Sequence, residues 1–78
     1  MNIGERLLHV FRKEFGTDTI DQRVSTQSCS AWDSLGHIRL LIAIECEFGF
    51  EPSPEEIVEM YSDFQTIERI VARQSPQR

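Results

Sequence analysis

The segment from residue 34 to residue 48 most constrains the fold, because its apolar residues recur at helical spacing until Gly49 ends the pattern. On a helical wheel of about 100° per residue, this segment carries two apolar stripes instead of one. The stripe expected to face the core consists of Ile38, Leu41, Ile44 and Phe48. The other stripe consists of Leu35, Ile42 and Cys46, and Arg39 interrupts it. A helix that is apolar on most sides lies at the centre of a bundle or leaves part of its surface for a partner.

A first helix is predicted ahead of this segment. The residues that recur at helical spacing are Ile3, Leu7, Val10, Phe11 and Phe15. The run Asn2-Ile3-Gly4-Glu5 has the form of a capping arrangement, and Gly16 is a fitting stop.

Two further helices are predicted near the C-terminus. Ser53-Pro54-Glu55-Glu56 combines a capping box with proline at the first helical position, and it opens a short helix that runs through Met60. A second box, Ser62-Asp63-Phe64-Gln65, is expected to open the last helix. Its apolar series is Phe64, Ile67, Ile70 and Val71.

Residues 17–33 are rich in Thr, Ser, Asp and Gln, with isolated apolar residues at Ile20, Val24 and Trp32. This composition predicts a long loop pinned to the core at those three positions. A loop of this length is unusual in a compact domain and is often functional. Trp32 is expected to plug the core, since a tryptophan buries a large apolar area.

These segments predict an all-α fold, a small four-helix bundle of three main helices and one short helix with a long loop between the first and second helices. A single domain is expected over residues 1–72, followed by a flexible C-terminal tail over residues 73–78. With 78 residues, the chain is near the smallest size at which a hydrophobic core stabilises a fold without disulfides or a bound metal. Little mass is left for an enzyme cleft.

The formal net charge of −5 argues against nucleic acid and anionic membrane as partners and favours basic protein surfaces. Eight of the acidic residues lie between residues 45 and 68, a stretch without Lys or Arg, which is either a solvated face or a docking surface. Two cysteines are too few for a disulfide framework, and neither a signal-like N-terminus nor a long apolar run is evident. We therefore expect a cytoplasmic monomer that does not insert into membranes.

Ser34 stands where the apolar helical pattern begins. A helix N-terminus offers free N–H groups and the positive end of the helix dipole, and both favour a phosphate group. A phosphodiester on Ser34 is therefore favourable. The alternative is that Asp33 or Ser34 is only an N-cap, because both residue types are preferred at that position.

Taken together, residues 3–71 resemble the acyl carrier protein family. The matching parts are Asp33-Ser34-Leu35, the series Ile38, Leu41 and Ile44, the run Glu45-Cys46-Glu47-Phe48-Gly49-Phe50, and Pro54-Glu55-Glu56. The resemblance implies that Ser34 carries a covalent 4′-phosphopantetheine cofactor, with Asp33 and Leu35 beside it. The thiol of this arm would hold an acyl or aminoacyl group as a thioester. Such a protein is a carrier with no catalytic residue of its own, not an enzyme.

The resemblance also implies partners: a phosphopantetheinyl transferase, an acyl- or aminoacyl-loading ligase, and synthases or acyltransferases. By the family's pattern the docking surface here consists of Leu35, Arg39, Ile42, Glu45, Glu55, Glu56 and Glu59. The sequence departs from the best-known fatty-acid carriers at Ser30-Ala31-Trp32 and at Gly36-His37-Ile38-Arg39. The Trp-Asp-Ser-Leu-Gly-His run looks like discrete carriers of bacterial pathways for polyketides, amino acids or surface polymers. Arg39 reverses the charge expected on the docking face, so a specialised pathway is expected.

Three alternative interpretations come from other classes of protein. The main one is an unmodified helical interaction module that binds partners through the acidic face and the Leu35–Ile42 stripe. A hydrolase built from Ser34, His37 and Asp33 is disfavoured, because an oxyanion hole and a substrate pocket are also needed. His37 is instead expected to pack or to make a local hydrogen bond. A metal site is not expected, because the histidines and cysteines lack paired ligand spacing, and Cys46 is expected to be a small apolar filler.

Overall fold

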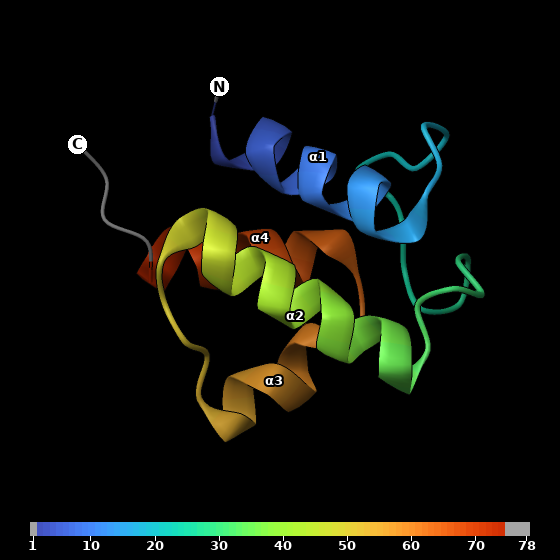
Figure 1. Cartoon of the computed structure of the whole chain (residues 1–78). Coiled ribbons are helices and arrows are strands. Elements are labelled where there is room, and N and C mark those ends of the chain that lie inside the picture. The colour runs from blue at the N-terminus through green and yellow to red at the C-terminus, as the bar shows by residue number, and fades with distance from the viewer. Residues whose placement is uncertain (1, 75–78) are drawn as a thin grey trace.

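The computed structural model of the chain describes residues 2–74, which form four α-helices (Figure 1). Their bounds are α1 Ile3–Phe15, α2 Ser34–Phe48, α3 Pro54–Met60 and α4 Phe64–Gln74. Within this range there is no β-strand, and the one isolated bridge pairs Ser25 with Asp63. The predicted all-α fold with three longer helices and one short helix is confirmed.

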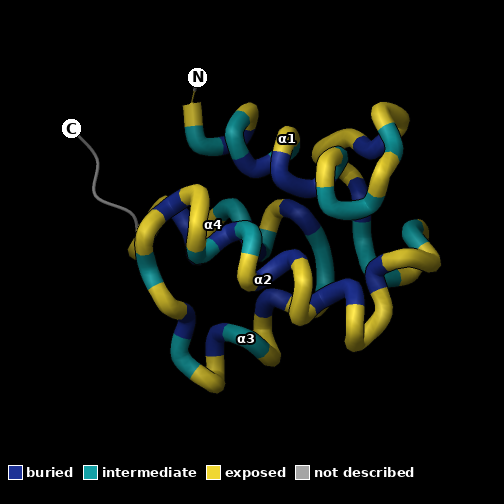
Figure 2. The backbone as a smooth tube through the Cα atoms, viewed as in Figure 1, coloured by how far each residue is buried: buried dark blue, intermediate teal, exposed yellow. Residues whose placement is uncertain are grey.

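The helices are arranged around α2, which lies between α1 and α3 in Figure 1 with α4 behind it. α1 packs against α2 and α4, and α3 packs against α4. Figure 2 shows buried and exposed positions in turn along each helix, as expected for helices that share one core. Among the described residues, fifteen buried apolar side chains from the four helices and the α1–α2 connection form this core.

Two helix starts and two helix ends follow the sequence signals. The Asn2 side chain accepts from the Glu5 N–H while the Glu5 carboxylate accepts from the Asn2 N–H, so a complete capping box opens α1. Ser53 and Glu56 form the same reciprocal pair at α3. Gly16 and Gly49 end α1 and α2 with φ of 70° and 75°, in the left-handed region where glycine lacks a steric penalty.

The expected start of α4 is wrong by one residue. Asp63, not Ser62, caps this helix, because the Asp63 carboxylate accepts from the Thr66 N–H at 2.8 Å. The Ser62 hydroxyl donates to the Glu59 carbonyl and so closes the end of α3. At its other end α4 continues to Gln74, two residues past the expected domain boundary at residue 72. The rest of the expected tail, residues 75–78, lies outside the described residues.

The connection between α1 and α2 consists of turns and bends, and its three apolar residues are buried as predicted. The Phe64 N–H donates to the Val24 carbonyl and the Thr26 N–H donates to the Ser62 carbonyl, which ties the connection to the junction of α3 and α4. Trp32 is 1% exposed and meets the Phe11 ring edge-on, with 5.2 Å between the ring centroids. The predicted role of Trp32 as a core plug is confirmed.

The predicted core face of α2 is correct for three of its four residues. Leu41, Ile44 and Phe48 are buried, but Ile38 is 55% exposed. Leu40, which neither predicted stripe included, is 0% exposed. The core-facing side is rotated because buried His37 takes the inward position in the first turn, and this turns Ile38 outward.

Candidate functional site

The candidate site is the first turn of α2, where Asp33 and Ser34 have separate roles. Asp33 is the N-cap: its Oδ1 accepts from the Gly36 N–H at 2.8 Å. Ser34 is the first helical residue, and its side chain is exposed. Its hydroxyl makes no hydrogen bond to another residue in the range 2–74. Of the two residues expected as a possible N-cap, Asp33 is therefore the one that caps α2, and the Ser34 side chain is left in solvent.

Close backbone packing fixes the position of the chain that leads into this turn. A Cβ atom at Gly36 would collide with the Ala31 carbonyl oxygen, so only glycine lets the first turn of α2 lie this close to the preceding chain. Together with the Asp33 cap, this contact fixes the direction in which the chain enters α2. The backbone of Ser34 therefore has a fixed position at the start of α2.

His37 lies in the same turn but points inward. Its Nδ1 accepts from the Trp32 indole N–H at 3.0 Å, and its Nε2 donates to the Ile57 carbonyl at 2.9 Å. Burial lowers the pKa of His37, and the Ile57 carbonyl opposes this shift in part by stabilising the charged form. Both ring nitrogens are occupied by partners other than Ser34 and Asp33. These three residues therefore form no nucleophile–base chain in the structure, and the expectation that His37 packs and makes a hydrogen bond is confirmed.

An exposed apolar stripe runs from the candidate site along α2. It consists of Leu35, Ile38 and Ile42, each more than half exposed. Val58 and Tyr61 add exposed apolar surface at α3 and its end. Sequence analysis missed the place of Ile38 in this stripe, although its spacing of three from Leu35 and four from Ile42 was the available signal.

Arg39 and Cys46 are also exposed on α2. Arg39 therefore reaches solvent beside the apolar stripe, as the docking prediction requires. The expectation that Cys46 is a small apolar filler is wrong, because the wheel position of Cys46 faces solvent once the core face is centred near His37 and Ile44.

The four acidic residues expected in the docking surface differ in their surroundings. Glu55 is exposed, Glu45 is half-buried, and Glu59 pairs with Arg69 at 3.1 Å. Glu56 is only 9% exposed and binds the Ser53 N–H, so it is not a free carboxylate.

The Glu56 carboxylate also links α3 to α4. Its second oxygen accepts from the Gln74 amide at 2.6 Å and from the Arg73 guanidinium at 3.2 Å. The Ser53 N–H, then Gln74 and Arg73, hold the pKa of Glu56 below its ordinary value. The expected docking role of Glu56 is therefore replaced by a structural one.

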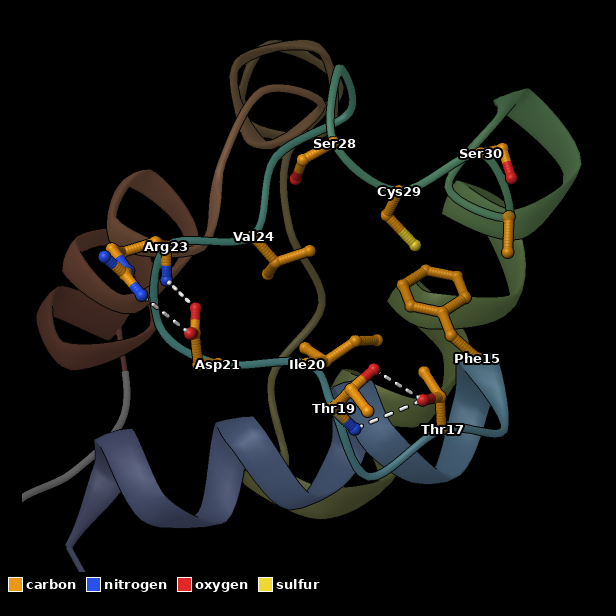
Figure 3. A pocket seen from close by; sticks show the side chains of 11 residues that line it. Phe15, Thr17, Thr19, Ile20, Asp21, Arg23, Val24, Ser28, Cys29 and Ser30 are labelled. Atoms are coloured by element: carbon orange, nitrogen blue, oxygen red, sulfur yellow. Dashed lines mark hydrogen bonds and ion pairs between the residues drawn. The ribbon is translucent and has the colours of Figure 1, made fainter.

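A pocket of about 500 Å³ is lined by residues of the α1–α2 connection, together with Phe15 at the end of α1. The side chains of Phe15, Ile20, Val24 and Cys29 point toward its middle (Figure 3). Hydroxyl side chains of the connection also line it. Sequence analysis did not predict this pocket; the loop's length and its Ser and Thr content were the only signals.

Among the described residues, no group of three or more His, Cys, Asp or Glu side chains is arranged to hold a metal ion. None of the helices in residues 2–74 has the length and hydrophobicity needed to cross a bilayer. Comparison of the sequence with protein-family models and with curated proteins found no match.

Proposed function

We propose that this protein is an acyl carrier in which Ser34 bears a 4′-phosphopantetheine arm through a phosphodiester. The observation that carries the proposal is the free Ser34 hydroxyl, exposed at the first position of α2 while Asp33 satisfies the cap. A serine there is not needed for helix stability. A phosphodiester at this position lies at the positive end of the helix dipole, beside unpaired backbone N–H groups.

The arm supplies the chemistry when it is attached: its thiol holds an acyl or aminoacyl group as a thioester. The chain's own task is to present the arm and to be recognised. A tethered thioester reaches successive partner enzymes at a high effective concentration, because the carrier and its cargo dock as one unit. The proposed partners are a phosphopantetheinyl transferase, a loading ligase, and synthases or acyltransferases in the cytoplasm, each meeting a monomeric carrier.

The surface offered to these partners is the apolar stripe Leu35, Ile38 and Ile42, with Arg39 beside it and Glu55 on α3. An exposed cation on an otherwise acidic carrier favours partners with an acidic residue opposite Arg39. We therefore propose a specialised polyketide, amino-acid or surface-polymer pathway. Normal rates of malonyl loading and elongation by a housekeeping fatty-acid synthase would contradict this assignment.

The experiment that tests the carrier role is intact-mass measurement after incubation with coenzyme A, Mg²⁺ and a broad-specificity phosphopantetheinyl transferase. We expect the parent chain to gain one phosphopantetheine and Ser34→Ala to gain none. Ser30→Ala is the matched control, because Ser30 is also exposed and lies four residues away. Gain by Ser34→Ala, or no gain by a folded parent chain with several transferases, would overturn the proposal.

The second candidate is an unmodified helical interaction module, and the exposed apolar stripe on α2 favours it. Such a patch beside polar residues is typical of a protein-binding surface whether or not Ser34 is modified. The same mass measurement separates the two candidates, since a module of this kind remains at the mass of its sequence.

A further inference from the structure

His37 joins three parts of the molecule that are separate in sequence. On one side its imidazole accepts from Trp32, the last core residue of the α1–α2 connection. On the other side it donates to the Ile57 carbonyl in α3, twenty residues away. We call Trp32, His37 and the Ile57 carbonyl the latch. Asp33 and Ser34 lie between the first two members, so the latch spans the turn that presents the Ser34 hydroxyl.

The partners of the imidazole fix its protonation state. The indole nitrogen of Trp32 is a donor only, so Nδ1 of His37 must be the unprotonated acceptor. The Ile57 carbonyl is an acceptor only, so Nε2 must carry the proton. The neutral Nε2–H tautomer is the one form of histidine that satisfies both hydrogen bonds.

We propose that the latch responds to protonation of His37. A proton on Nδ1 of His37 releases Trp32, and with it the chain leading into Ser34, while α3 stays bound through the Ile57 carbonyl. The step takes one proton from solvent, forms the Nδ1–H bond and breaks the hydrogen bond from the indole. Only the bond to Trp32 is lost, because the imidazolium still donates from Nε2 to the Ile57 carbonyl. The bond from Trp32 breaks because the indole N–H and the new Nδ1–H are both donors, and the two nitrogens are now 3.0 Å apart.

The surroundings of the ring favour the neutral form. Tyr61, at the end of α3, is the titratable side chain that faces the imidazole, with 4.8 Å between the ring centroids. From the connection, the Trp32 ring lies edge to edge with it, with 6.1 Å between the ring centroids. Among residues 2–74, the hydrogen-bond partners of the ring are the Trp32 indole and the Ile57 carbonyl, and no charged side chain pairs with it. Burial lowers this pKa below the usual 6.5, so release is expected in mildly acidic solution.

Release has consequences for the connection because Trp32 is held there by few other polar contacts. Its backbone N–H donates to the Cys29 carbonyl, and its indole otherwise meets the rings of Phe11, Phe15 and Tyr61. A buried indole N–H without a partner is costly, so the ring must turn to find water or another acceptor. This inference goes beyond the carrier function and does not depend on modification of Ser34.

The test is an NMR titration of ¹⁵N-labelled protein from about pH 8 to about pH 5, the range in which histidine changes charge. At the upper end we expect Nδ1 of His37 to be unprotonated and Nε2 to be protonated. As His37 titrates, the Trp32 indole N–H should change shift and lose its protection from solvent exchange with the same midpoint, below 6.5. A proton on Nδ1 at pH 8, or an indole N–H whose shift and solvent exchange do not change as His37 titrates, would overturn the proposal.

Fluorescence of Trp32, the one tryptophan in the chain, provides the variant test. His37→Asn keeps an acceptor near the position of Nδ1 but does not titrate, so its emission should lose the pH transition. His9→Asn is the matched control, because His9 is exposed on α1, and it should keep the transition. A transition that persists in His37→Asn contradicts the latch. Since the NMR titration uses the unaltered chain, it decides the proposal even if a variant fails to fold.

Discussion

At the residue scale, the first turn of α2 divides two tasks between neighbouring side chains. Asp33 satisfies an orphan N–H of the helix, and Ser34 keeps its hydroxyl in solvent. Both residues are good N-caps, so sequence alone could not assign the cap. The backbone conformations identify Asp33 as the cap, because Asp33 is extended, with φ −100° and ψ −169°, whereas Ser34 is already helical.

This division predicts different costs for two adjacent substitutions. Asp33→Ala should lower the free energy of unfolding by about 1 kcal/mol, the usual cost of removing an N-cap. Ser34→Ala should change it by less than about 0.5 kcal/mol, as for an ordinary surface position. Urea unfolding followed by circular dichroism measures both. A larger loss for Ser34→Ala than for Asp33→Ala would show that Ser34 is the cap.

A second pair of substitutions tests the core face of α2. Leu40 is 0% exposed, so Leu40→Ala should cost about 2–5 kcal/mol, which combines lost burial with the cavity left behind. Ile38→Ala removes an exposed side chain and should cost less than about 0.5 kcal/mol. The two urea midpoints measured under one condition give the comparison. Similar losses at both positions would contradict the rotated core face.

At the scale of the element, α3 is the helix that depends most on its surroundings. It has seven residues, too few to be stable alone, and its stability must come from contacts. The Ser53–Glu56 capping box opens it, the Ile57 carbonyl binds His37, and Glu56 reaches Gln74 of α4. The helix expected to offer acidic docking residues therefore also uses one of them to hold its own position.

Two adjacent glutamates in α3 allow this dependence to be tested. Glu56→Ala removes the bond to the Ser53 N–H and the link to α4, so its urea midpoint should fall clearly below that of the parent. Glu55→Ala is the matched control, because Glu55 is exposed, and it should stay close to the parent. Equal midpoints for the two variants would show that the Glu56 contacts add nothing to stability.

The elements were more predictable from sequence than their contacts. Capping boxes at Asn2 and Ser53 and glycines at 16 and 49 act within one helical turn, so local sequence reveals them. The His37–Ile57 bond joins residues twenty apart, and the Glu56–Gln74 bond joins residues eighteen apart. Such pairs depend on how helices pack, which no local pattern encodes. The same limit explains why Ile38 and Leu40 were misplaced by a small rotation of α2.

At the scale of the whole molecule, four titratable groups with lowered pKa values connect stability to pH. The pKa of His37 is lowered in the fold, so the unfolded chain binds its proton first as the pH falls. Its contribution is fully present above about pH 6.5 and is lost as the pH falls toward the folded pKa. The pKa values of Asp21, Glu56 and Asp63 are also lowered, and they act in a lower window, below their ordinary values near 4.

We therefore predict a stability profile with two separate declines on acidification. The free energy of unfolding should fall first below about pH 6.5 and again below about pH 4.5. Urea titrations at a series of pH values measure the profile. His37→Asn should lose only the upper decline, because the three carboxylates keep their partners. A profile that is flat between pH 7 and pH 5 in the parent chain would contradict the assignment of His37.

We propose above that the exposed Ser34 hydroxyl at the start of α2 is the attachment point of a phosphopantetheine arm. The most direct measurement is peptide fragmentation mass spectrometry of the chain, as isolated from the cells that make it and after treatment with a transferase and coenzyme A. We expect one phosphopantetheine group, located on Ser34 and on no other serine. A folded chain whose Ser34 peptide stays unmodified in both samples, or an arm found on another residue, would contradict it.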